Sequence, residues 1–202
     1  MPMIVSSGLA QRMATTRLKV YIECSEVEKR KKPGSSNQSS EGTFLKDLWD
    51  LDIPSKIKHF LWRASNESLP TKKNLFRRQV TRTATCDCCH NGVEDTIHAL
   101  WECQAVKETW WEDGFCWQQL SVHFANFRDL FMGILNVKNG NLAERFAYIA
   151  WSIWAKRNAS RLDLNYLPYS RIYSDAMECL QEFQSAKRSM LGAEQIPPPT
   201  VH

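Results

Sequence analysis

Four residues between positions 86 and 103 have the types and the spacing of a metal site. Cys86 and Cys89 are separated by two residues, a gap that lets adjacent backbone amides wrap under an ion, and His98 and Cys103 follow after a short loop. Thiolate sulfur and imidazole nitrogen suit Zn²⁺, which takes such ligands in a closed tetrahedron without a position for water. The pattern therefore predicts a structural zinc site and not a catalytic one.

Two further residues of the same stretch, Cys88 and His90, compete for the role of ligand. Cys88 lies one residue from Cys86 and adjoins Cys89, which is too close for the usual two-residue turn, and His90 directly follows Cys89. We therefore expect both to stay outside the coordination sphere. The alternative interpretation of the whole stretch is a set of buried thiols beside a surface histidine, without a metal.

The cysteine content bears on the compartment. The seven cysteines are an odd number, and no secretory hydrophobic segment precedes the cluster. This favours metal binding over disulfides and an intracellular reducing compartment, with the nucleus or the cytoplasm preferred. Basic residues among serine and threonine before Glu23 leave organellar targeting as the alternative. No apolar run approaches the length of a membrane span, so we expect no membrane insertion.

Basic residues are concentrated ahead of the cluster. The formal charge of the chain is only +4, but between positions 56 and 82 the single acidic residue is Glu67. Such a basic face could follow the phosphates of RNA or DNA, with Trp62 or Phe76 stacking on bases, and the alternative is a solvated helix face without a ligand. The candidate nucleic-acid-binding residues are Lys56, Arg63, Lys72, Lys73, Arg77 and Arg78.

Two predicted helices lead the chain to the cluster. The first opens at Pro54-Ser55, and its apolar positions recur with the helical period. The second begins after Thr71, whose side chain can accept a hydrogen bond from the backbone amide of Asn74, and we expect Leu75 and Val80 to be buried. The apolar stripe of the first helix consists of Ile57, Phe60, Leu61 and Ala64.

The third predicted helix cannot be continuous. It starts after a cap at Asp95-Thr96 and carries His98. His98 and Cys103 are five residues apart, so on an unbroken α-helix their side chains would point about 140° away from each other. The helix must therefore break or bend near Glu102 if both residues are to reach one ion.

The rest of the chain also favours helices. Residues 104–111 and about 170–191 show helical periodicity, and residues 142–158 show the strongest, which predicts the principal core helix of the second half. Residues 25–43 and 192–202 are poor in apolar side chains, so we expect them to be flexible. The fold class is mainly α. The predicted domains are a flexible segment (1–43), a zinc-stapled helical module (44–113), a helical connector (114–191) and a proline-rich tail (192–202).

The order and spacing of these features resemble a known family. From about position 44 to 111 the chain is similar to the zinc-binding domain that follows the reverse transcriptase in plant LINE-type (non-LTR) retrotransposon proteins. Residues 149–158 and the Pro197-Pro198-Pro199 tail look like the connector that leads into a ribonuclease H domain in such polyproteins. The residues that carry the main resemblance are Leu48, Trp49, Pro54, Lys56, Phe60 to Ala64, Leu69 to Thr71, the four candidate ligands and Trp110.

The resemblance implies a zinc-binding module that contacts RNA or DNA. The Tyr-x-Asp-Asp carboxylates of such a polymerase and the acidic cluster of a ribonuclease H are missing from the sequence, so we expect a fragment or derived gene that is not an enzyme and has no small-molecule substrate. The alternative is a protein-interaction module. In that case the docking surface would be the 142–158 helix or the aromatic residues Trp110, Trp111, Phe115 and Trp117.

Overall fold

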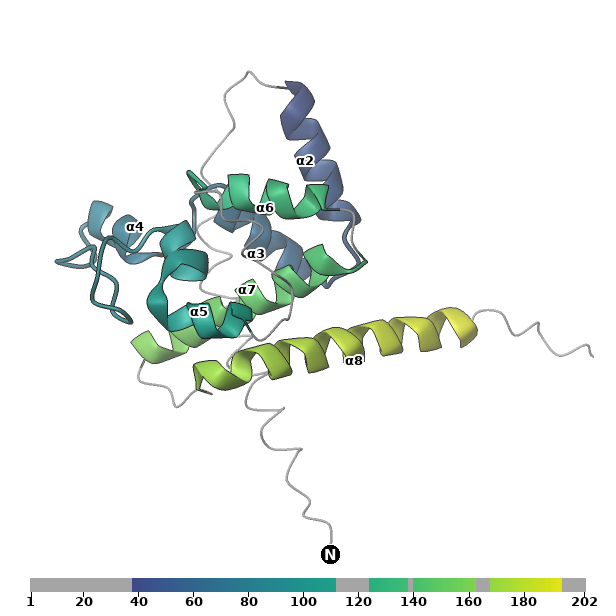
Figure 1. Ribbon diagram of the computed structural model, residues 1–202. Coiled ribbons are helices and arrows are strands. Elements are labelled where there is room, and N and C mark those ends of the chain that lie inside the picture. Colours follow the sequence, from purple (N-terminus) through teal and green to yellow (C-terminus); the bar gives the residue numbers. More distant parts are fainter. Residues whose placement is uncertain (1–37, 112–123, 138–139, 163–167, 194–202) are drawn as a thin grey trace, which may run out of the picture. The chain divides into compact units, whose positions relative to one another are not determined.

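The structure is a computed structural model that describes residues 38–111, 124–137, 140–162 and 168–193. Within these ranges the fold is helical, as the sequence predicted, and the extended pairing consists of one isolated bridge between Thr85 and Val93. The helices are α2 (Gln38–Asp50), α3 (Ser55–Ser65), α4 (Lys72–Arg77), the π-helical turn η2 (His98–Glu102), α5 (Gln104–Trp111), α6 (Phe127–Asn136), α7 (Leu142–Arg161), the 3₁₀ turn η4 (Tyr169–Arg171) and α8 (Ile172–Ala193) (Figure 1).

The chain divides into two units, Met1–Glu41 and Gly42–His202, and the packing described here belongs to the second. Helix α2 begins at Gln38, so helix already includes residues 38–43, which the sequence predicted to be flexible. Helix α8 ends at Ala193, so it includes the first two residues of the predicted tail (192–202). The rest of that tail and the predicted boundary after residue 113 lie outside the described ranges, so the domain division stays a prediction. None of the described helices is both long and apolar enough to cross a membrane.

Helices α3 and α4 form as the sequence indicates. The four apolar residues of the α3 stripe are all buried. The side chain of Thr71 caps α4 by accepting from the backbone amide of Asn74, with 3.3 Å between the two atoms. The burial predicted for Val80 is wrong, because its side chain is 67% exposed. Helix α4 ends at Arg77, and Gln79 has a φ of +60°, so the chain has left the helical period before it reaches Val80.

Helix α7 is the centre of the packing. It contacts α3, α6, η2 and α8, and α7 and α8 lie side by side along much of their length (Figure 1). Phe146, at its first turns, packs its ring against Trp110 of α5, with 4.9 Å between ring centroids, and against Phe131 of α6 at 5.8 Å. Five consecutive residues from Phe146 to Ala150 are buried, so α7 is covered on several sides. The predicted principal core helix is thus confirmed, and it continues to Arg161.

The helices on either side of α7 also follow the sequence. Helix α5 covers the predicted range 104–111 and buries Val106 and Trp110, and α8 buries Ile172 and Ala176 along its apolar stripe. Burial of Trp110, which is 3% exposed, removes it from the surface that the protein-interaction alternative required. The 142–158 helix is not available as a docking surface either, because none of its residues is exposed. Phe115 and Trp117 lie outside the described residues.

Replacement of Phe146 by Ala should lower the free energy of unfolding by about 3–5 kcal/mol, because a fully buried aromatic ring is lost from the centre of the packing and the cavity collapses only partly. Urea unfolding followed by circular dichroism measures the change. The control is Met190→Ala on α8, whose side chain is 73% exposed and whose loss should change stability by less than about 0.5 kcal/mol. Equal effects of the two substitutions would contradict the assignment of α7 as the core.

Candidate metal centre

A tight loop positions the first two cysteines. The loop is closed at its base by the bridge between Thr85 and Val93 and by a hydrogen bond of 3.2 Å from the amide of Cys86 to the carbonyl of Gly92. At its tip the amide of His90 donates to the carbonyl of Cys86 at 3.0 Å. Gly92 has a φ of +75°, a conformation that costs little for glycine and more for other residues. The loop thus returns the chain on itself with Cys86 and Cys89 on the same short turn.

A π-helical turn positions the other two residues. The amide of Cys103 donates to the carbonyl of His98 at 2.9 Å, which is the i to i+5 bond of a π-helix. This wider turn brings residues five apart toward one face, and Cys103 then leaves the helix with a ψ of 130°. The break predicted from the 140° separation is therefore present. The predicted cap is also confirmed, because a carboxylate oxygen of Asp95 accepts from the amide of His98 at 3.1 Å.

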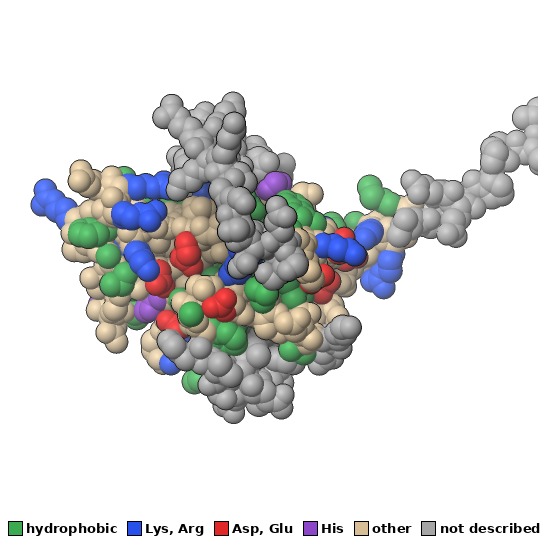
Figure 2. Space-filling view, turned by 90° about the horizontal axis from the view of Figure 1, so that it is seen from above, with side chains coloured by type: hydrophobic (Ala, Val, Ile, Leu, Met, Phe, Trp, Pro, Cys, Tyr) green, Lys and Arg blue, Asp and Glu red, His purple; other side chains and the backbone are tan. Residues whose placement is uncertain are grey.

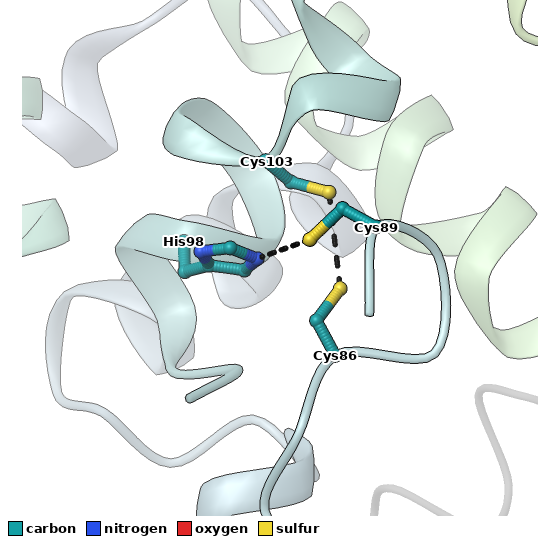
Figure 3. Close-up of side chains that lie close together, drawn as sticks. All are labelled: Cys86, Cys89, His98 and Cys103. Atoms are coloured by element: carbon teal, nitrogen blue, oxygen red, sulfur yellow. Dashed lines mark hydrogen bonds between the residues drawn. The ribbon is translucent and has the colours of Figure 1, made fainter. Parts of the chain in front are cut away.

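The four candidate ligands meet in one cluster (Figure 3). Their ligand atoms all lie within 4.8 Å of one another. The Sγ atoms of Cys86 and Cys103 are 3.8 Å apart, and the Sγ of Cys89 is 3.3 Å from Nε2 of His98. Zinc–sulfur bonds of about 2.3 Å in a tetrahedron place two sulfur atoms about 3.8 Å apart, so the cluster fits this ion. All four cysteines of residues 86–103 are free thiols.

The electrostatic surroundings favour the thiolate form of Cys86. Burial by itself raises the pKa of this thiol. Hydrogen bonds from the backbone amides of Cys89 and Cys88 and from the Arg157 guanidinium outweigh that effect and lower the pKa to about 6. Because the thiolate is the form that binds metals, Cys86 is prepared for coordination.

The two competing residues stay outside the cluster, as expected. His90 is exposed. Cys88 is half-buried and directs its Sγ to the hydroxyl of Tyr169, 3.3 Å away, while burial raises the pKa of its thiol. Cys88 is therefore poorly suited to be a reactive thiolate, and nothing in the cluster requires it as a fifth ligand.

A buried ionic group beside the cluster was not predicted from the sequence. The carboxylate of Glu94 accepts from Nη1 of Arg157 at 3.0 Å and forms a second ion pair with Arg161. Both partners lie on α7, more than 60 residues along the chain. The sequence does hold one signal for this group, which is the position of Arg157 on the predicted helix. Arg157 follows Ile153 by four residues and Trp154 by three, so it lies on the apolar stripe of α7, where an unpaired charge would be costly.

The predicted basic residues have different surroundings. Lys72 pairs with Asp87 in the loop between Thr85 and Asp95, which we call the metal loop, at 2.9 Å, and Lys73 pairs with Asp95 at the end of this loop, at 3.2 Å. The Nζ of Lys56 lies over the ring of Trp151, 5.0 Å from its centroid, and Nη2 of Arg63 donates to the carbonyl of Ser68 at 3.3 Å. The side chains of Arg77 and Arg78 are exposed and form no ion pair with any described residue.

Comparisons with known proteins agree with this site. Residues 33–110, which are less than half of the chain, match the family model described as zinc-binding in reverse transcriptase. Over 68 residues the chain is 32% identical to a putative ribonuclease H protein of Arabidopsis thaliana, and the match covers 34% of this chain and 11% of that protein. No solved structure matches the chain. The matched segment includes all four residues of the cluster and ends before α7.

Two glycine substitutions should have opposite effects on stability. Gly92→Ala should lower the free energy of unfolding by about 1–2 kcal/mol, because φ of +75° is unfavourable for alanine although its Cβ would meet no atom within 4 Å. Gly42→Ala, in α2 and equally open, should raise it by up to about 1 kcal/mol because alanine favours the helix. Thermal unfolding of both variants measures the difference. A destabilised Gly42→Ala would contradict the helix at Gly42, and a neutral Gly92→Ala would contradict the left-handed backbone at Gly92.

Proposed function

We propose that this chain is a non-catalytic module derived from the reverse transcriptase polyprotein of a plant LINE-type retrotransposon. In it, Cys86, Cys89, His98 and Cys103 hold one structural Zn²⁺. The observation that carries the zinc proposal is the close approach of three sulfur atoms and one imidazole nitrogen in a segment that matches a zinc-binding family model. Three thiolates and one imidazole saturate a tetrahedral ion, so no position is left for a reacting water. The bound ion would fix the loop against the π-helical turn.

The loop in turn is fastened to α4. The backbone amide of Lys73 donates to the carbonyl of Glu94 at 2.9 Å, and the amide of Lys72 donates to the carboxylate of the same residue at 3.1 Å. These bonds satisfy donors at the start of α4 that have no partner within the helix. We therefore expect that metal binding also stabilises the 55–80 region, because a structural zinc contributes about 10–16 kcal/mol to the folding of small zinc domains.

The zinc assignment predicts one Zn per chain by elemental analysis of the purified full-length protein. Cys89→Ser should lose most of the metal, because serine is a poor ligand for Zn²⁺. Cys88→Ser is the matched control, since this neighbouring thiol lies outside the cluster, and it should keep its zinc. Chelation of the wild type should accelerate amide hydrogen exchange in the loop and in residues 55–80. Retention of full zinc by Cys89→Ser, or unchanged exchange in both regions, would contradict the assignment.

The second part of the proposal is contact with RNA or DNA through the outer end of α4. Among the six candidate cations, Lys72 and Lys73 are paired, whereas Arg77 and Arg78 are exposed and form no ion pair with any described residue. Phe76 next to them is 50% exposed. Figure 2 shows basic and hydrophobic side chains together on the side of the molecule where α4 lies. Cations beside an exposed ring suit a single strand, because the arginines can bind its phosphates while the ring stacks on its bases.

Two kinds of substitution distinguish phosphate contacts from base stacking. Binding of labelled single-stranded RNA and DNA is measured by fluorescence anisotropy at several salt concentrations. Arg77→Gln combined with Arg78→Gln should weaken binding and reduce the slope of log affinity against log salt by about 1.4, the value for two lost phosphate contacts on a single strand. Phe76→Ala should cost about 1–3 kcal/mol of binding free energy and leave the slope unchanged, because stacking releases no counterions.

The control for this experiment is Lys107→Gln, an equally exposed cation on α5, which should bind as the wild type does. Binding that is absent, or independent of salt, would contradict the nucleic-acid proposal and would favour the protein-interaction alternative. That alternative retains Trp111, which is exposed at the end of α5. A pull-down in the presence of nuclease would then be the measurement that identifies a protein partner.

A further inference from the structure

Arg157 reaches from α7 into the metal centre. Its side chain is 1% exposed, and its Nε donates to the carbonyl of Ala99, the residue after His98, at 2.7 Å. Its Nη1 lies 3.0 Å from the carboxylate of Glu94 and within 3.3 and 3.5 Å of the sulfur atoms of Cys88 and Cys86. One guanidinium thus contacts both halves of the centre, the loop that carries the first two ligands and the turn that carries the others.

A role in stability alone explains these contacts poorly. Burial of a guanidinium and a carboxylate removes both from water, and replacement of such a pair by apolar side chains is often neutral or stabilising. The Nη2 atom of Arg157 is buried and has no hydrogen-bond partner among the described residues, which adds to the cost. Besides Glu94 and the Cys88 sulfur, the donors of Arg157 contact the sulfur of the candidate ligand Cys86 and the carbonyl of Ala99, next to His98. Contacts of this kind orient the ligands of metal sites.

The formal charges support the same role. A divalent zinc ion with three thiolates carries a net charge of minus one, and the carboxylate of Glu94 adds another. Arg157 and Arg161 are the two cations that face this buried carboxylate. With zinc bound, the formal charges of these four groups would sum to zero. The two arginines lie beyond residue 110, where the match to the zinc-binding family model ends.

We propose that Arg157 is a positioning residue of the metal centre, held in place by Glu94, and that the metal-binding unit therefore extends along α7 to Arg161. The inference rests on the proposed zinc site. Arg157 fixes the loop and the turn relative to each other and stabilises the negative charge on the Cys86 sulfur through its N–H···S contact. The segment that matches the family model holds all four candidate ligands but lacks this positioning residue.

The test uses the full-length protein loaded with zinc. Arg157→Met keeps much of the side-chain volume without the donors. It should bind zinc about 10- to 100-fold more weakly than the wild type, the usual effect of losing a contact to a ligand, and should release it correspondingly faster to a chromogenic chelator. The matched control is Arg145→Met on the same helix. Arg145 is half-buried and its Nη2 is 3.4 Å from the hydroxyl of Tyr173, so its loss disturbs α7 without reaching the metal centre.

A spectroscopic readout separates positioning from stability. In the cobalt-substituted protein, loss of the N–H···S contact should move the thiolate-to-cobalt charge-transfer band of Arg157→Met to lower energy, because the sulfur becomes more electron-rich. The band of Arg145→Met should stay in place even if that variant unfolds more easily. If Arg157→Met does not fold, Arg157→Lys carries the test. Its single nitrogen cannot serve every partner, so we expect the same band shift and an intermediate release rate.

The two proposals fail in different ways. A wild-type protein that binds no zinc would refute the zinc assignment itself. A wild type with one zinc per chain, together with Arg157 variants whose release rate and cobalt spectrum equal those of the wild type, would refute only the role of Arg157. A faster release from Arg145→Met that equals the release from Arg157→Met would also refute it, because the effect would then come from a general loosening of α7.

Discussion

The buried carboxylate of Glu94 joins three parts of the structure. It accepts hydrogen bonds from the backbone amide of Lys72 at the start of α4, from Nη1 of Arg157 and from Arg161, and it is 1% exposed. A carboxylate removed from water is stable only if such partners replace its hydration, and loss of one partner of a buried pair costs about 3–5 kcal/mol. The metal loop, α4 and α7 therefore cannot adopt independent positions while this group remains buried.

Because of this constraint, the segment that contains the candidate ligands cannot be treated as separate from α7. The four candidate ligands all lie in the segment that matches the zinc-binding family model, yet the guanidinium that contacts both the loop and the turn comes from α7. The same helix packs Phe146 against Trp110, the last residue of that segment. The matched segment thus contacts α7 at two places: Trp110 packs against Phe146 near the start of the helix, and Cys86 contacts Arg157 near its end. Within the Gly42–His202 unit, the cluster and the helix that follows it form one packed structure.

The features predicted well from the sequence are those that depend on residues close together along the chain. The clustering of the four candidate ligands follows from their spacing, the break after His98 follows from the geometry of an α-helix, and the stripe of α3 follows from its period. The contact between Glu94 and Arg157 was missed because 63 residues separate them, and only tertiary packing decides which charge meets which. Val80 was misplaced because periodicity does not tell where a helix ends, which here depends on the left-handed conformation of Gln79.

Contacts from the residues around the candidate metal centre also orient α4. Lys72 and Lys73, at the start of the helix, pair with Asp87 and Asp95 of the metal loop, so the loop fixes both the position and the rotation of α4. One helical turn later the side chains that are not used in this way, Phe76 to Arg78, face solvent. A surface pair of this kind contributes about 1 kcal/mol or less, but two pairs and two backbone bonds from one loop restrict the orientation of a six-residue helix strongly. Residues next to the candidate ligands therefore set the direction in which this short helix displays its exposed side chains.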